Sequence, residues 1–342
     1  RHAGDDAVVL TAALDQRQGD DGTRPPAGQV ARVAVRPDGT ADLDDLDRCL
    51  HEHAGRVALL AVPGASDATG VVQPVHALAE RVHAAGGRIA VDAAHLASHR
   101  PIDMRRHGDP GHLDVVALSG HTMYAPFGSG ALVGDRALLV GDPRDGGGAT
   151  WRAVTTAGTG PVGPAGADSR VNVLGAVALG AAARSLAEIG LERIAAHESD
   201  LVGRAAAGLA SVPGITVHGP TGPEAARANA GIVPFTAEDV EPALVAAILG
   251  YEHAVGVRSG CFNTAPNGTP ELVRLSVGFH NRAADIDRVI DALGRVMSGD
   301  IAGVYRLGAD GAHHPRGYME PRPEIFGSGP GQRGAPRRLR SG

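Results

Sequence analysis

The chain has 342 residues, of which 43% are hydrophobic and only 3% aromatic, so its core must be built mainly from Ala, Val and Leu. The formal charge is -6, and basic residues form no stripe outside the extreme C-terminus, which argues against nucleic-acid binding. The two cysteines, Cys49 and Cys261, form no zinc or disulfide pattern, and no apolar run reaches the roughly 18 residues of a membrane span. We therefore expect a cytoplasmic protein with neither nucleic-acid nor membrane partners.

Strand and helix patterns alternate through the first half of the chain. Short apolar runs typical of buried strands lie at residues 7–11, 33–35, 57–62, 88–91 and 115–118. A helix is expected between the second and third runs, capped by Asp42 or Asp44. Another is expected between the third and fourth runs, beginning at Pro74 and ending at Gly86. Repeated strand–helix units predict an α/β fold with a mainly parallel sheet.

The second half predicts a smaller α+β unit. It begins with a long Ala-rich helical stretch at residues 174–210. Strands are then expected within 213–220 and 230–237, a helix and a strand within 241–260, and a strand within 272–279. An amphipathic helix at 280–297 closes this unit, with Ile286, Val289, Ile290 and Leu293 on one face. The Gly-, Pro- and Arg-rich remainder lacks periodicity and is expected to be a flexible tail.

Polar residues follow the fourth and fifth apolar runs. Asp92 and His95 come after the fourth, and Ser119, His121 and Thr122 come after the fifth. Because ligands bind beyond the carboxyl ends of parallel strands, we expect both clusters to face one crevice. The alternative is local: an Asp that ends a strand often caps the next helix, and a Ser-Gly-His turn can merely satisfy backbone groups.

Two segments resemble a known family. Residues 91–104, VDAAHLASHRPIDM, and residues 119–134, SGHTMYAPFGSGALVG, are similar to the core of the class V aminotransferase and cysteine desulfurase family, which uses pyridoxal 5'-phosphate (PLP). The resemblance implies an aspartate-aminotransferase-like fold (PLP fold type I) and a homodimer. It also implies that an N-terminal part of the family fold is missing. It divides the chain into a large PLP-type domain (1–175), a connecting helix (176–200), a small C-terminal domain (201–300) and a flexible tail (301–342).

Several positions suit the roles that the resemblance implies. Asp92 stands where the family's aspartate pairs with the pyridine nitrogen, and His95 where many members donate a hydrogen bond to the ring oxygen. Ser119 and His121 would contact the phosphate, and His121 is the nearest candidate base. Arg274 matches the arginine that clamps the carboxylate of an amino-acid substrate.

Other positions depart from the family. Gln16 replaces the histidine that stacks on the pyridine ring, and Asp67 replaces an asparagine near the ring oxygen. Arg170 falls near a threonine that reaches the neighbouring subunit's phosphate. At the position of the desulfurase cysteine the chain has Asn263, so Cys261 is expected to have a structural or bystander role. Thr122 occupies the position of the lysine that forms the Schiff base with PLP.

The change at Thr122 affects chemistry most. A threonine hydroxyl cannot form a Schiff base, and all 32 residues counted as Lys or Arg are arginines, so no other lysine can replace it. Two hypotheses follow. The first is a PLP-family protein that binds PLP without a covalent bond and acts on amino acids without ordinary Schiff-base catalysis. The alternative is a catalytically inactive homologue with a structural or regulatory role. Because five family positions have changed together, we favour the loss of ordinary transaminase and desulfurase activity. A dinucleotide-binding fold is a weaker alternative, because no glycine-rich fingerprint follows a first strand in the sequence.

Overall fold

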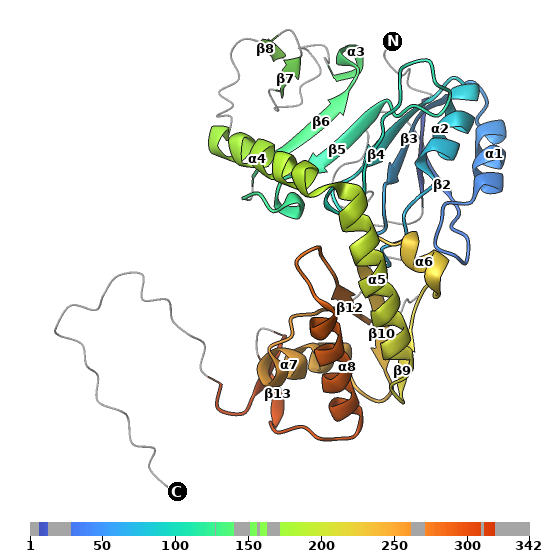
Figure 1. Ribbon diagram of the computed structural model, residues 1–342. Coiled ribbons are helices and arrows are strands. Elements are labelled where there is room, and N and C mark those ends of the chain that lie inside the picture. Colours follow the sequence, from blue (N-terminus) through green and yellow to red (C-terminus); the bar gives the residue numbers. More distant parts are fainter. Residues whose placement is uncertain are drawn as a thin grey trace, which may run out of the picture.

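The computed structural model describes residues 7–12, 29–126, 128–139, 151–155, 158–162, 172–260, 271–308 and 311–318. Within these residues an α/β unit and a smaller α+β unit are connected by two long helices (Figure 1). Each unit has its own hydrophobic core.

The larger sheet has six strands in the order β2-β1-β3-β4-β5-β6. Their bounds are Val8–Ala12 (β1), Gln29–Val33 (β2), Val57–Pro63 (β3), Arg88–Asp92 (β4), Val115–Ser119 (β5) and Gly130–Gly134 (β6). All neighbours pair in parallel except β5 and β6, which are antiparallel. This confirms the mainly parallel sheet.

The prediction for the second strand was wrong in its position. The strand is Gln29–Val33, whereas residues 33–35 were expected. Val35 instead forms an isolated antiparallel bridge with Ala41, across a turn in which Gly39 has a φ of 82°. Only Val33 of β2 is buried, so this edge strand gives no continuous apolar run.

Helices cover the larger sheet as the sequence predicts. The helix α1 is Leu43–Glu52, and α2 is Val75–Ala84. The cap of α1 is Asp42, whose side chain accepts hydrogen bonds from the amides of Asp44 and Asp45. The remaining short elements of this unit are η2 (Leu96–Ser98), η3 (His121–Met123), α3 (Arg136–Leu139) and a separate hairpin of β7 (Trp151–Thr155) and β8 (Gly158–Val162).

The predicted single helical stretch is two helices. They are α4, Val173–Ile189, and α5, Leu191–Ala210, and they meet at Gly190 with a bend of 74°. The φ of Gly190 is 93°, which favours glycine strongly. Figure 1 shows α4 beside the larger sheet and α5 running to the smaller unit. Among the described residues no single helix is long and apolar enough to cross a membrane, although the bent α4–α5 pair together meets that length and composition test.

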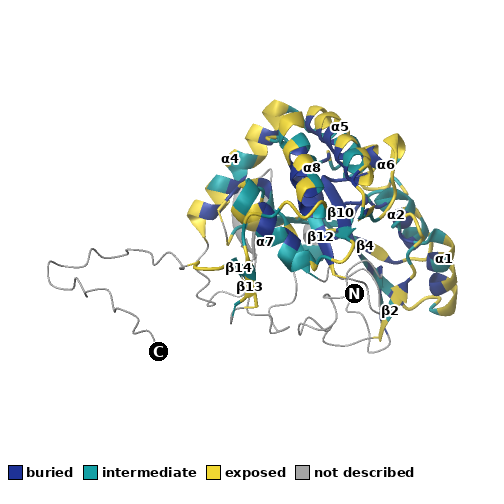
Figure 2. Ribbon diagram, turned by 90° about the horizontal axis from the view of Figure 1, so that it is seen from below, coloured by how far each residue is buried: buried dark blue, intermediate teal, exposed yellow. Residues whose placement is uncertain are grey.

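The smaller unit packs helices on an antiparallel sheet. Its strand order is β11-β12-β10-β9, with bounds Ile215–Val217 (β9), Ile232–Ala237 (β10), Arg258–Gly260 (β11) and Leu272–Ser276 (β12). Its helices are α6 (Pro223–Arg227), α7 (Pro242–His253) and α8 (Ala283–Met297). Figure 2 shows β10 largely buried and the outer face of α5 exposed. The face of α8 that carries Ile286, Val289 and Leu293 is buried, as predicted.

Part of the expected flexible tail is ordered structure. Strands β13 (Tyr305–Leu307) and β14 (His313–Pro315) form a hairpin. Glu252 of α7 holds it, because its carboxylate accepts hydrogen bonds from the amides of Ala302 and Gly303 and from the Tyr305 hydroxyl. Residues 319–342 of that predicted tail lie outside the described residues.

Candidate functional site

The residues predicted to face one crevice follow the carboxyl ends of neighbouring parallel strands. Asp92 ends β4 and is in register with Pro63 of β3 and with Ala117 of β5. Ser119 ends β5 two residues further on. The backbone remains paired as the strands end, since the amide of Gly64 donates to the carbonyl of Asp92 over 2.7 Å. The sheet therefore places Asp92 and Ser119 on adjacent strand ends.

The turn after β5 holds three of the predicted residues. Ser119 Oγ and His121 Nδ1 are 2.9 Å apart, and the Thr122 hydroxyl donates to the Ser119 carbonyl over 2.9 Å. A Cβ at Gly120 would lie 2.0 Å from Ser129 Oγ and 2.9 Å from the Ser129 carbonyl, so the turn requires glycine. His121 is exposed and Thr122 is half-buried. The hydroxyl of Thr122 thus makes a local backbone hydrogen bond.

Asp92 and His95, at and just after the end of β4, make different contacts. One carboxylate oxygen of Asp92 accepts a hydrogen bond from the amide of Ala94 over 2.9 Å. His95 Nε2 lies 2.8 Å from the carbonyl oxygen of Ala230, which can only accept, so this nitrogen carries the proton. Burial, together with the positive charges of His99 and Arg274, lowers the pKa of His95 to about 3.

These contacts affect the donor role predicted for His95. A neutral imidazole has a single N–H, and here the Ala230 carbonyl uses it. The remaining nitrogen, Nδ1, carries a lone pair and accepts a hydrogen bond. Donation from His95 to a ring oxygen therefore does not fit this arrangement.

Asp67 and Arg274 are brought together although 207 residues separate them. The Arg274 guanidinium, from β12, donates to the backbone carbonyl of Asp67, in the loop after β3. Burial lowers the pKa of Arg274, and the facing charge of Arg258 acts in the same direction while Asp67 opposes it. Arg258 is the direct cross-strand partner of Arg274. The smaller unit thus places a guanidinium against the loop that follows β3. Gln16, Arg170, Cys261 and Asn263 lie outside the described residues.

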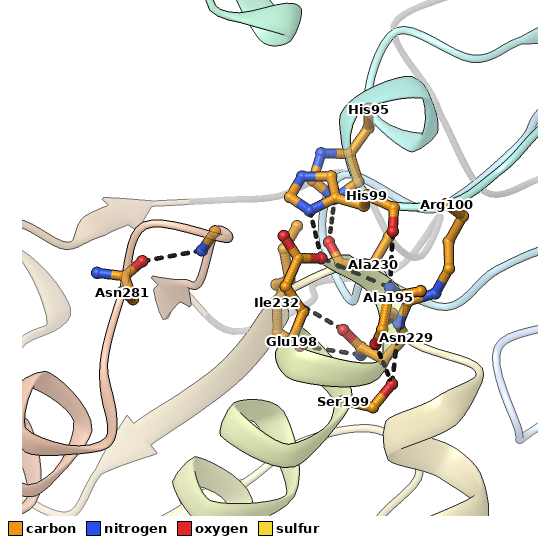
Figure 3. Close-up of polar contacts among 11 residues, drawn as sticks. His95, His99, Arg100, Ala195, Glu198, Ser199, Asn229, Ala230, Ile232 and Asn281 are labelled. Atoms are coloured by element: carbon orange, nitrogen blue, oxygen red, sulfur yellow. Dashed lines mark hydrogen bonds and ion pairs between the residues drawn. The ribbon is translucent and has the colours of Figure 1, made fainter. Parts of the chain in front are cut away.

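A buried network beside this site was not predicted. Glu198 of α5 is fully buried, and its carboxylate lies 2.9 Å from His99 Nδ1 and 3.5 Å from Arg100 Nη1 (Figure 3). The Arg100 guanidinium also donates to the carbonyl of Asn229 and to the Ser199 hydroxyl. The sequence signal was a glutamate on the otherwise apolar buried face of α5. The network ties the segment after β4 to α5 and to the chain just before β10.

Comparisons with known proteins agree with this architecture. Residues 26–289 match the model of the family described as Aminotransferase class-V. A probable cysteine desulfurase of Halalkalibacterium halodurans is 32% identical over 279 residues, covering 76% of this chain and 63% of the relative. A cysteine desulfurase of Dickeya dadantii is 31% identical over 281 residues, covering 79% of this chain and 64% of the relative.

This chain belongs to the class V aminotransferase family. The apo structure of a cysteine desulfurase from Thermococcus onnurineus NA1 superposes with a TM-score of 0.70 at 26% identity, over 86% of this chain and 73% of that one. This confirms the predicted α/β architecture of PLP fold type I. The chain spans less than two-thirds of the length of the two curated relatives just described.

Members of the class V aminotransferase family depend on PLP. We therefore ask whether the residues at the ends of β4 and β5 fit this cofactor. A covalently attached PLP does not fit, because none of the 342 residues is lysine. A non-covalent PLP fits better. The carboxylate of Asp92 has an oxygen that receives no hydrogen bond from the described residues, and Ser119 and His121 offer polar groups on the adjacent strand end.

Proposed function

We propose that this class V aminotransferase family protein binds PLP without a covalent bond and does not catalyse ordinary transamination or desulfuration. One observation carries the proposal: the chain contains no lysine, and the hydroxyl of Thr122, at the position that we predict for the family lysine, donates to the Ser119 carbonyl. The usual lysine also moves the proton at the substrate α-carbon. Loss of a general base alone costs ~10²- to 10⁴-fold in rate.

The chain's own residues would divide the binding between them. Asp92 would keep the ring nitrogen protonated, and Ser119 and His121 would hold the phosphate. Arg274 would hold the carboxylate of an amino acid, and His121 is the nearest side chain that could accept a proton. When bound, PLP supplies an electron sink for the substrate α-carbon.

A second candidate function has an observation in its favour. The Arg274 guanidinium already donates to the Asp67 carbonyl, and the N–H of His95 already donates to the Ala230 carbonyl. Both groups, which are expected to meet ligands, thus already make a hydrogen bond within the chain. This arrangement suits a catalytically inactive homologue with a structural or regulatory role.

The Thr122→Lys substitution tests the proposal. We expect the native chain to retain PLP only reversibly, with no label trapped on the protein by borohydride. Thr122→Lys should gain a borohydride-trapped PLP but little turnover, because the other departures from the family remain. Thr216→Lys, on the exposed face of β9, is the matched control for a lysine placed elsewhere. Mass spectrometry of the reduced proteins locates the label.

Equilibrium dialysis with PLP separates the two candidates. If PLP binding is saturable and Asp92→Asn weakens it, the proposal of a protein that binds PLP without a covalent bond is supported. No saturable binding would contradict it and support the inactive homologue. Label trapped on the native chain would contradict both.

A further inference from the structure

A second cluster of ionisable side chains lies at the opposite end of the large sheet from the candidate PLP site. His83 is in the last turn of α2, and Asp114 directly precedes β5, with His112 two residues earlier. The side chains are mostly buried, with exposed fractions of 15% for His83, 13% for His112 and 3% for Asp114. None of these residues contributes to the candidate PLP site.

Backbone carbonyls fix which nitrogen of each ring carries its proton. His83 Nδ1 lies 2.7 Å from the carbonyl oxygen of Pro110, and His112 Nδ1 lies 2.6 Å from that of Asp109. Because a carbonyl only accepts, both Nδ1 atoms are protonated. In the neutral rings the lone pairs therefore lie on Nε2.

Both lone pairs point toward the same carboxylate. His83 Nε2 is 2.8 Å from Asp114 Oδ2, and His112 Nε2 is 3.5 Å from Asp114 Oδ1. His112 Nε2 is buried and has no hydrogen-bond partner among the described residues. Two lone pairs that face a carboxylate repel it unless a cation lies between them.

Protonation of the two imidazole rings does not complete the contacts of both Nε2 atoms with Asp114. A proton on His83 Nε2 would complete one hydrogen bond but leave the His112 lone pair facing Asp114. Protonation of both rings would stack two positive charges, since the ring centroids are 4.2 Å apart with 20° between the planes.

We propose that His83, His112 and Asp114 bind a divalent transition-metal ion of the Zn²⁺ type, with water in the remaining coordination position. Two imidazole nitrogens and one carboxylate oxygen are ligands typical of Zn²⁺ and Co²⁺. Metal-binding histidines generally donate their other ring N–H to a carbonyl or carboxylate, as both rings do here.

The distances require only a small adjustment. The three ligand atoms all lie within 4.8 Å of one another. Metal–ligand bonds of about 2.0–2.2 Å in a tetrahedral site place ligand atoms roughly 3.3–3.6 Å apart. Arg88 competes for the site, because its Nη1 is 3.2 Å from Asp114 Oδ1, but its side chain is 50% exposed and can turn into solvent. The amide of Ile89 donates to Asp114 over 2.9 Å and orients the carboxylate.

The test is a titration of the full chain, stripped with a chelator, with Co²⁺ and then Zn²⁺. We expect one equivalent of Co²⁺ to give the visible absorption of tetrahedral coordination and Zn²⁺ to displace it. His83→Asn and His112→Asn retain an N–H donor for the carbonyl but remove Nε2. Each should weaken binding at least about tenfold. Arg88→Gln should strengthen it, because a competing cation is removed.

His51→Asn, an exposed histidine of α1, is the control and should leave Co²⁺ binding unchanged. Binding that is equal in the native chain, His83→Asn and His112→Asn would overturn the proposal and assign the ion to other histidines. Absence of a tightly bound equivalent would overturn it as well. Arg88→Gln needs neither ring altered, so the site is testable even if one histidine variant does not fold. PLP binding does not enter any of these measurements.

Discussion

The fully buried Glu198 carboxylate lies at the junction between the two units. It lies against His99 and Arg100, and burial already lowers the pKa of Arg100 while Glu198 opposes that shift. Removing one partner of a buried ion pair leaves the other charge without compensation. We expect Glu198→Ala to reduce the free energy of unfolding by about 3–5 kcal/mol in urea titrations.

Glu198→Gln retains an acceptor for His99 and should lose less than Glu198→Ala. Glu188→Ala, at an exposed position of α4, is the matched control and should remain within about 0.5 kcal/mol of the native chain. If Glu198→Ala unfolds at the same urea concentration as this control, the network does not stabilise the junction.

His95 gives the protein a predicted pH dependence. Its pKa is lowered from 6.5 to about 3, first by burial and then by the charges of His99 and Arg274. Between these two pH values the unfolded chain binds a proton that the folded chain does not. The unfolded state therefore gains stability as the pH falls. We expect the His95 contribution to folding to decrease from about pH 6.5 toward pH 3.

The measurement compares urea unfolding at pH 7 and pH 5 for the native chain and for His95→Asn. The variant should lose less stability between these pH values, because the titrating group is gone. His51→Asn, exposed on α1, should retain the native dependence. Equal pH dependence in all three proteins would mean that His95 is not the group responsible.

At the scale of elements, burial decides what the sequence could predict. The strands β3, β4 and β5 were predicted to within one residue because a strand buried on both faces gives a continuous apolar run. The edge strand β2 gives no such run, and the Ala-rich pattern continues through Gly190 without marking the bend. Asp92 and Ser119 were placed at strand ends by the same pattern. The Asp67–Arg274 contact was not predictable, because it joins segments 207 residues apart.

The bend between α4 and α5 depends on the backbone of Gly190. With φ at 93° and ψ at 112°, this residue has a conformation that a Cβ disfavours. We expect Gly190→Ala to lower the free energy of unfolding by at least about 1–2 kcal/mol. Thermal unfolding followed by circular dichroism measures the loss.

Gly180→Ala is the matched control within α4. A Cβ there would meet only Arg184 Nη1, at 3.8 Å, and alanine favours helix over glycine by about 0.5–1 kcal/mol. The control should therefore stabilise the chain. Two alanine variants that shift stability in the same direction would contradict the special role of Gly190.

At the scale of the whole molecule, three contacts join the smaller unit and its connecting helix to the segments that follow β3 and β4. The Arg274 guanidinium donates to the Asp67 carbonyl, and His95 donates to the Ala230 carbonyl. The Glu198 carboxylate lies 2.9 Å from His99 Nδ1. The contacts on the large unit all lie in segments that follow β3 or β4. Any movement of the smaller unit must therefore change the surroundings of the candidate PLP site.

Helix α4 gives the whole molecule a surface that suits the proposed homodimer. Val173, Leu174 and Val177 share one face of it, and their exposed fractions are 62%, 84% and 65%. Exposed apolar clusters of this kind mark protein interfaces. We propose that two copies bury this face against each other.

Leu174→Asp should shift the chain from dimer to monomer in sedimentation velocity, because a charge would be buried without a partner. Leu307→Asp, in β13 and 63% exposed, should leave the dimer intact. A monomeric native chain would contradict the dimer, and a Leu174→Asp dimer of native affinity would place its interface elsewhere.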